Sequence, residues 1–326
     1  MPAVAATPRR ARSSPTGRAT VVIGGSKRPS RSVLAGRALD IDAAFRSHEL
    51  RSAPEAISRT QRTIWTRPQK STTVTNTQVT LIQLDNYGPW TVTPKPRREV
   101  DLQTMQSRLY ADLSQLFGNR DGYVFFSRFD NMIAVTNGLD IDDHALIQES
   151  IGNRYPVTTS LSIAVDPAPI AALGTATDQL QAAGSAQDKD RRSILRGDPL
   201  DEAERTDDDL HIAHFDVNDA TGQYTDELNE FDTFISIEQG YAELMRYMRK
   251  AHDSLSFFVG GDNVIAVCAG IGADDYRDAI THVREAVDVE LKVGVGRAAT
   301  AHGAGMDAKH ALEACRHDGH DVVIDD

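Results

Sequence analysis

The sequence contains few cysteines, few aromatic residues and no long apolar run. Only two cysteines, Cys268 and Cys315, occur among 326 residues, which excludes a disulfide framework and a four-cysteine zinc site. No stretch approaches the roughly 18 consecutive apolar residues of a membrane-spanning helix, and the first residues lack the apolar segment of a secretory signal. We therefore expect a cytoplasmic protein from a reducing compartment, without a membrane partner.

Charge is distributed unevenly along the chain. Residues 1–73 contain 14 basic and four acidic residues, whereas the remaining residues have a net charge of −22, which gives −12 for the whole chain. An acidic body resists aggregation and nonspecific binding to nucleic acid, and salt screens its self-repulsion. The composition favours a halophilic source with a salt-rich cytoplasm and argues against a nucleic-acid partner.

Residues 1–75 are predicted to form a disordered basic extension. They are rich in Arg, Ser, Thr and Ala and show no sustained apolar period. Such a composition fits an Arg-rich transit peptide, and it also fits DNA read in frame before the true start. Because a valine codon can serve as an initiator, a second hypothesis places that start near Val74. Mass spectrometry of the native N-terminus would decide between them.

After this extension, one apolar pattern occurs twice. Each copy predicts the order βαββαβα, over residues 76–186 and again over 210–326, with an acid-rich linker over 187–209. Aligning residues 125–138 with 257–270, an offset of 132, gives eight identities in 14 positions. We therefore predict an α+β protein of two tandem, ferredoxin-like palm units with antiparallel sheets.

Each unit carries two carboxylates at matching places. Asp85 ends the first opening strand and Asp130 lies in its hairpin turn; Asp216, 131 positions after Asp85, and Asp262 do so in the second unit. Because these strands are neighbours in a βαββαβ sheet, the two carboxylates of each unit should meet. A lone turn of this composition is usually only a turn. Two matched pairs favour a cation, since paired carboxylates otherwise repel, and oxygen ligands suit Mg²⁺.

Several longer motifs resemble the archaeal GTP cyclohydrolase III family. The strand-end Asp opposite a Gly-Gly-Asp turn is also similar to the palm domains of nucleotide cyclases. The resemblance extends from about residue 78 to the C-terminus. The motifs are Gln83–Pro94, Arg97–Glu99, Arg128–Asn131, Asn153–Pro156, Gly184–Asp188 and Gly260–Asn263.

The resemblance implies hydrolysis of GTP at C8 of the imidazole ring and at the phosphoanhydride. The product would be 2-amino-5-formylamino-6-ribosylamino-4(3H)-pyrimidinone 5′-phosphate, with two phosphates released, for flavin and deazaflavin biosynthesis. It also implies Mg²⁺, a monovalent activator such as K⁺, and a homo-oligomer. The candidate catalytic and metal-binding residues are then Asp85, Asp130, Asp216 and Asp262, and which of them acts as general base stays open.

Candidate substrate-binding residues lie beside the aspartates. The arginines would neutralise phosphates, and the glycines allow close approach of the backbone. The asparagines offer amides to a guanine edge or a metal, and the tyrosine offers a ring to a purine, although such residues are also common in turns and cores. The set is Asn86, Tyr87, Arg97, Arg128, Asn131, Gly260, Gly261 and Asn263.

Two other functions stay open at this point. A nucleotidyl cyclase would use the same metals on GTP but leave the imidazole ring intact, so loss of the guanine ultraviolet absorption would exclude it. A non-catalytic GTP-binding regulator would bind GTP without turnover. Four aspartates in two complete pairs argue against the regulator.

Overall fold

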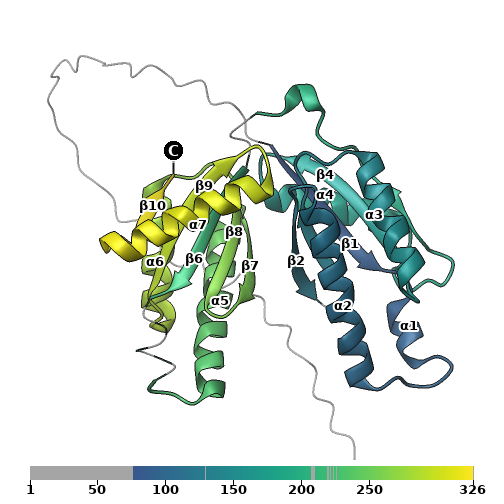
Figure 1. Cartoon of the computed structure of the whole chain (residues 1–326), viewed down its shortest axis with the longest axis horizontal. Helices are drawn as coiled ribbons and strands as arrows, with labels where there is room; N and C mark the ends of the chain where they lie inside the picture. Colours follow the sequence, from purple (N-terminus) through teal and green to yellow (C-terminus); the bar gives the residue numbers. More distant parts are fainter. Residues whose placement is uncertain are drawn as a thin grey trace, which may run out of the picture. The chain divides into compact units, whose positions relative to one another are not determined.

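A computed structural model describes residues 76–325, apart from residues 129, 207–209, 219, 221, 223 and 225. The predicted basic extension and the hypothesis of a start near Val74 lie outside the described residues. Within the described part, no helix is both long and apolar enough to cross a membrane. Two α+β halves follow one another along the chain (Figure 1).

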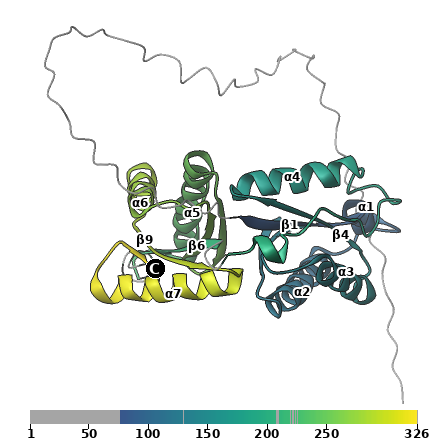
Figure 2. The same cartoon turned by 90° about the horizontal axis from the view of Figure 1, so that it is seen from above.

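The first half is a five-stranded sheet in the order β2-β3-β1-β4-β5. Helices α2 and α3 cover one face of this sheet, and α4 covers the other (Figure 2). The elements are β1 (Thr77–Leu84), α1 (Tyr87–Val92), α2 (Glu99–Gly118), β2 (Tyr123–Arg128), β3 (Asn131–Val135), α3 (Ile141–Arg154), β4 (Thr159–Asp166), α4 (Pro169–Ala182) and β5 (Leu195–Arg196).

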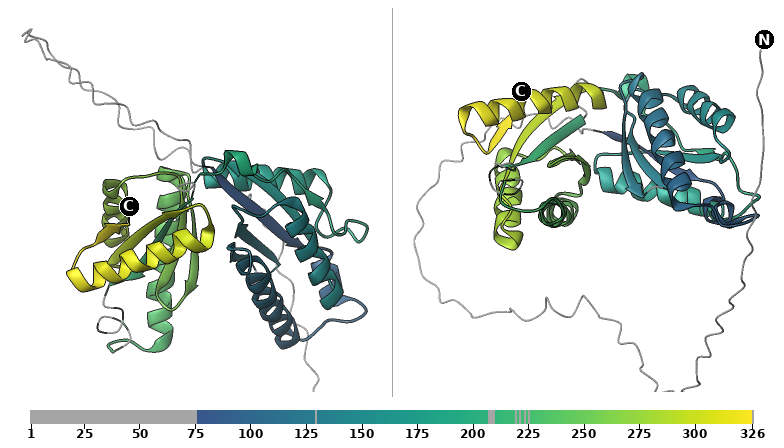
Figure 3. Two further views of the ribbon diagram at one scale, coloured as in Figure 1. Left: turned by 45° about the horizontal axis from the view of Figure 1, so that its top comes forward. Right: turned by 60° about the horizontal axis from the view of Figure 1, so that its bottom comes forward.

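The second half repeats this plan in the order β10-β9-β6-β8-β7. Helices α5 and α6 cover one face, and α7 lies along the other, close to β9 (Figures 2 and 3). After the short 3-10 helix η2 (Glu202–Glu204), the elements are β6 (Leu210–Val217), α5 (Glu230–His252), β7 (Leu255–Gly260), β8 (Asn263–Cys268), α6 (Ala273–Val287), β9 (Leu291–Ala298), α7 (Ala301–Asp318) and β10 (Val322–Ile324).

Strand β1 shows how alternation builds two cores from one strand. Val79 and Leu81 pack with α4, whereas Ile82 and Leu84 pack with α2 and α3, because successive side chains of a strand point to opposite faces. The next odd-numbered residue after the strand, Asp85, therefore belongs to the α4 side of the sheet. The same rule places His214 and Asp216 on the α7 side of the second sheet, since Ala213 and Phe215 pack with α5 and α6.

Close packing fixes α7 against β9. A Cβ atom added at Gly294 would lie 2.1 Å from the main-chain nitrogen of Leu312, and one at Gly296 would lie 2.3 Å from that of Ala308. Thr300 is the N-cap of the helix: its side chain accepts a hydrogen bond from the main-chain N–H of Gly303. The position of every side chain on α7 thus depends on two strand residues without a Cβ.

One apolar core contains residues of both halves. The rings of Phe125 on β2 and Phe257 on β7 stack with their centroids 4.4 Å apart, and Ala304 of α7 belongs to the same buried cluster as Ala176 of α4. Burial of these apolar side chains stabilises the fold because it removes apolar surface from water. The described residues, from 76 onward, accordingly belong to a single compact unit.

The predicted α+β class and the duplication are confirmed, with two differences. Each sheet is mixed, because its fifth strand runs parallel to its neighbour: β5 beside β4, and β10 beside β9. In addition, the segment 187–209, predicted as a linker, contains β5, which completes the first sheet. A two-residue strand has too few positions to show alternation, so the sequence pattern gave no signal for it.

Candidate functional site

The carboxylate of Asp85 lies at the end of β1 and is 3% exposed. It accepts hydrogen bonds from the hydroxyls of Thr158 (2.8 Å) and Ser160 (2.6 Å) and from the main-chain N–H of Ser193 (2.8 Å). Three donors use most of the roughly four acceptor positions of a carboxylate. Asp85 therefore binds the 184–193 segment to the sheet.

Residues 184–193, which we call the strap, follow α4 and lie against the end of β1. The main-chain N–H of Asn86 donates to the carbonyl of Ala186 (2.6 Å), and that of Gly88 donates to the side chain of Gln187 (2.9 Å). The guanidinium of Arg191, 5% exposed, donates to the Gln83 side chain at 2.9 Å. Its pKa is lowered by burial, which the negative charge of Asp85 opposes. Two motifs that are about 100 positions apart thus meet at one strand end.

The main chain of Asp130 pairs with β1 at Leu84, next to Asp85, while the Asp85 and Asp130 carboxylates have different partners. The N–H of Leu84 donates to the carbonyl of Asp130 at 3.0 Å. The Asp130 carboxylate accepts from the Asn131 amide at 2.8 Å and lies 3.5 Å from Nε of Arg128, which is largely exposed. The structure thus brings the hairpin turn to the strand end, as the topology predicts, and directs the Asp85 side chain to β4 and the strap.

The second half has a different arrangement around Asp216, which is 3% exposed. Nη2 of Arg316 donates to one of its oxygens at 2.7 Å and Nε to the other at 3.3 Å. The main-chain N–H of Val217, next to Asp216, donates to the carbonyl of Asp262 at 3.3 Å, and burial followed by the negative charge of Asp216 raises the pKa of Asp262. These two carboxylates are therefore an interacting pair.

His214 and Asn263 connect to this pair. Nε2 of His214 lies 2.9 Å from Oδ1 of Asn263, whose amide donates to Asp262 at 2.9 Å. Since Oδ1 of an amide only accepts, Nε2 carries the proton. Burial lowers the pKa of His214, so the ring is neutral near neutral pH. This series of bonds fixes the orientation of the Asp262 carboxylate.

Strand register corrects the predicted equivalence of Asp85 and Asp216. Gln83 lies opposite Asn131, and Asp216 lies opposite Asn263, two asparagines that the offset of 132 superimposes. Gln83, not Asp85, therefore occupies the place of Asp216, and each receives an arginine guanidinium. In the sequence, Asp85 matches Asp216 because each follows an apolar strand segment. Structural equivalence is instead set by which residues of the neighbouring strands they pair with.

The two hairpin turns share a bulge but differ in its residue. Register shifts occur between Phe126 and Arg128 and between Phe258 and Gly260. Gly260 has φ of 113°, and Gly261 has φ of 64°, conformations that glycine adopts without strain. Arg128 therefore occupies the position of Gly260, and only the second half has a backbone without a side chain at this point of the turn.

A cavity of about 310 Å³ opens beside this glycine turn. Its wall joins the turn to α7 and contains two cationic side chains, Lys309 and Arg316, of which Arg316 pairs with the buried carboxylate of Asp216. Cations and a free glycine backbone beside carboxylates suit a phosphate bound with a metal ion. The lining residues are His214, Val259, Gly260, Asn263, Lys309, Leu312, Glu313 and Arg316.

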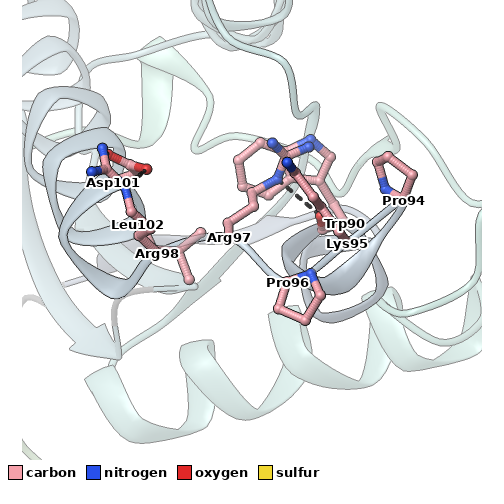
Figure 4. A pocket seen from close by; sticks show the side chains of 8 residues that line it. All are labelled: Trp90, Pro94, Lys95, Pro96, Arg97, Arg98, Asp101 and Leu102. Carbon is pink, nitrogen blue, oxygen red and sulfur yellow. Dashed lines mark hydrogen bonds and ion pairs between the residues drawn. The ribbon is translucent and has the colours of Figure 1, made fainter. Parts of the chain in front are cut away.

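A second cavity, of about 580 Å³, lies in the loop after α1 (Figure 4). The guanidinium carbon of Arg97 lies 3.9 Å from the centroid of the Trp90 ring, and Nε donates to the Trp90 carbonyl at 3.1 Å. Arg98 pairs with Asp101 at 2.7 Å, with both side chains exposed, a contact that stabilises little. The cavity is cationic and is lined by Trp90, Pro94, Lys95, Pro96, Arg97, Arg98, Asp101 and Leu102.

Tyr87, the first residue of α1, contacts Gln106 of α2 and Trp90 of α1. It is 9% exposed, its hydroxyl accepts from the Gln106 amide at 2.8 Å, and its ring stacks on Trp90 with centroids 6.0 Å apart. Burial, followed by the charges of Glu99 and Asp130, raises the pKa of its hydroxyl. Its observed contacts position α1.

Sequence reasoning missed several residues of these sites. Arg316 lies 100 positions from Asp216, and Arg191 lies 108 positions from Gln83. No local pattern marks either arginine. Thr158 immediately precedes β4 and Ser160 lies on it, two positions apart, a spacing that places both hydroxyls on one face of an extended chain.

The second-half carboxylates fit the chemistry of Mg²⁺. Burial and mutual repulsion raise the pKa of Asp262, and a cation relieves such repulsion. Among the described residues, no group of three or more His, Cys, Asp or Glu is arranged to hold a metal ion. Mg²⁺ commonly binds one or two carboxylates and takes its other oxygens from water and substrate phosphates, a ligand set with which two neighbouring carboxylates are compatible.

Comparisons with known proteins show which sequences this chain resembles. The sequence profile described as GTP cyclohydrolase III matches residues 79–324. GTP cyclohydrolase III of Natronomonas pharaonis is 77% identical over 249 residues, which are 76% of this chain and 98% of that protein. GTP cyclohydrolase III 1 of Halobacterium salinarum is 69% identical over 252 residues, 77% of this chain and 98% of that protein.

Likeness to solved structures is weaker. The GGDEF domain of a Pseudomonas aeruginosa protein matches 36% of this chain and 82% of its own, at 18% identity and a TM-score of 0.32. The fold and site described above define a duplicated α+β protein with paired carboxylates and cations beside a glycine turn. The sequence comparisons name the family: this chain belongs to GTP cyclohydrolase III.

Proposed function

We propose that this chain hydrolyses GTP at C8 of the imidazole ring and at the phosphoanhydride, giving the formylamino-pyrimidine ribonucleotide monophosphate and two phosphates for flavin and deazaflavin biosynthesis. The observation that carries the proposal is the match of residues 79–324 to the family, together with relatives matched over 98% of their length. The interacting carboxylates and the cation-lined cavity of the second half give it a physical basis.

The proposal assigns Mg²⁺ to Asp216 and Asp262. Bound there, Mg²⁺ would supply charge neutralisation to the triphosphate. Lys309 and Arg316, which line the same cavity, bind phosphate oxygens, and the glycine turn brings main-chain N–H groups close to them. The neutral His214 ring fixes Asn263 and, through it, Asp262.

In the first half, the proposal gives Asp85 a positioning role and leaves Asp130 as the more accessible carboxylate. The amides of Asn86 and Asn131 and the cations Arg97 and Arg128 are assigned to the nucleotide. A K⁺ activator is part of the same proposal and has no assigned residue.

A homo-oligomer is also proposed. Exposed apolar side chains concentrate at the start of α5, where Phe231 is 68% and Phe234 50% exposed. Exposed apolar clusters commonly mark interfaces between proteins. Light scattering of the purified chain, beside a Phe231→Ser, Phe234→Ser variant, would measure the change in mass.

The test of the activity is incubation of the purified full chain with GTP, MgCl₂ and KCl. We expect loss of the guanine ultraviolet absorption, the product mass of the ring-opened monophosphate, and two phosphates for each GTP consumed. Asp262→Asn serves as the impaired comparison. An intact guanine chromophore in the product would reject the proposal and favour a nucleotidyl cyclase.

A further inference from the structure

Arg316 forms an ion pair at the carboxylate that the proposed function assigns to Mg²⁺. It lies in the last turn of α7 and donates to both oxygens of Asp216, at 2.7 and 3.3 Å. The side chain of Asp216 is only 5% exposed. The hydrogen bond to Asp216 also raises the pKa of Arg316, so the guanidinium is charged throughout the accessible pH range.

This contact competes with a metal ion for the same two oxygens. A bidentate guanidinium neutralises the carboxylate and occupies its outer lone pairs. A divalent cation that approaches Asp216 must therefore displace Arg316 or share its ligand, and both cost binding energy. In this arrangement Asp216 is a poor metal ligand on its own.

Arg316 has a place to move to. Its side chain is 40% exposed and lines the cavity of about 310 Å³ together with Lys309. Its Nη1 already extends to the exposed Glu313 at 2.6 Å. Phosphate oxygens are the other preferred bidentate partners of a guanidinium, and the cavity is where the proposed function places them.

We infer that Arg316 is a displaceable internal cation that keeps Asp216 closed to Mg²⁺ until nucleotide phosphates draw the guanidinium into the cavity. The inference rests on the proposed function, because it needs a phosphate-bearing substrate in this cavity. It makes metal binding depend on the nucleotide: the divalent ion binds weakly alone and tightly with the substrate. By linkage, the metal strengthens nucleotide binding by the same factor.

The test uses Mn²⁺ as the probe, titrated into the full-length protein without nucleotide and followed by electron paramagnetic resonance. Arg316→Gln removes the competing charge, so we expect Mn²⁺ to bind about tenfold more tightly than to wild type. The matched control is Arg277→Gln, which removes an exposed arginine that pairs with Asp274 on α6 and should leave Mn²⁺ affinity unchanged.

A structural role for Arg316 predicts the opposite sign. If the ion pair only stabilises the site, Arg316→Gln binds Mn²⁺ no better or more weakly, and the inference is overturned. Arg316→Lys keeps the charge without the bidentate geometry and should fall between wild type and Arg316→Gln, which keeps the test decisive if the glutamine variant folds poorly. Thermal unfolding without metal reports folding of each variant.

A second titration separates this inference from the proposed function. With a non-hydrolysable GTP analogue present, wild-type affinity for Mn²⁺ should rise, and the rise should shrink in Arg316→Gln because one phosphate contact is lost. If wild type forms the ring-opened product but Arg316→Gln does not tighten Mn²⁺ binding, the Arg316 inference fails alone. If Mn²⁺ binding tightens but wild type forms no product, the proposed function fails instead.

Discussion

Replacing Gly294 by alanine tests the link between β9 packing and the position of α7. The added Cβ would lie 2.1 Å from the Leu312 nitrogen and 2.3 Å from the Ala308 carbonyl oxygen, whereas ordinary contacts begin at 3.4 Å. Both atoms belong to the backbone of α7, so rotation of a side chain cannot relieve the contact. The helix must move away from β9, which pairs at this residue with His214 of β6.

The cost follows from packing energetics. Overpacking in a dense core costs about 1–3 kcal/mol and occasionally more; two backbone contacts this short place Gly294→Ala near 3 kcal/mol. For a unit of this size, about 2–4 °C of midpoint is lost per kcal/mol, so we expect a decrease of about 6–12 °C. Circular dichroism during heating measures it.

Gly174→Ala is the matched control. Gly174 lies inside α4, and a Cβ there would have no atom within 4 Å. Alanine is a better helix former by up to about 1 kcal/mol, so this variant should unfold at the wild-type temperature or slightly above it. Equal midpoints for Gly294→Ala and wild type would refute the claim that the glycine fixes α7. Lower nucleotide affinity in Gly294→Ala would show that displaced α7 also displaces Lys309.

Further predictions concern three buried or partly buried groups. His144 is fully buried, its Nδ1 lies 2.6 Å from the Asp140 carbonyl, and burial lowers its pKa. As the pH decreases, His144 is therefore protonated in the unfolded chain before it is protonated in the folded chain, and the free energy of unfolding should fall below about pH 6.5. Urea titrations at several pH values should show a weaker decrease in His144→Gln. Asp85→Ala leaves three donors unpartnered and should cost about 3 kcal/mol or more, with faster hydrogen exchange in the strap; no change in exchange would contradict the positioning role. Asp262→Asn removes the repulsion with Asp216 and should weaken Mn²⁺ binding, measured by calorimetry, without lowering the unfolding midpoint.

The sequence alone determined the duplication and the elements of each half. Apolar alternation and helical periods depend on neighbours along the chain, so they are readable without tertiary contacts. The eight identities between residues 125–138 and 257–270 predicted matching hairpins, and the structure has them as β2–β3 and β7–β8. The Gly260-Gly261 turn was also readable from the sequence, because residues of this type are common in hairpin turns.

Only the tertiary structure decided which residues meet at the strand ends. Pairing of β1 with β3 and β4 placed Gln83, and not Asp85, at the position of Asp216, and the fold brought Arg191 and Arg316 to those places from about 100 residues away. Such contacts depend on strand register and on helix packing, which are collective properties of the assembled sheet. A local sequence pattern specifies a strand and which residues point to each of its two faces. Which other residues pack against those faces is determined by the whole fold.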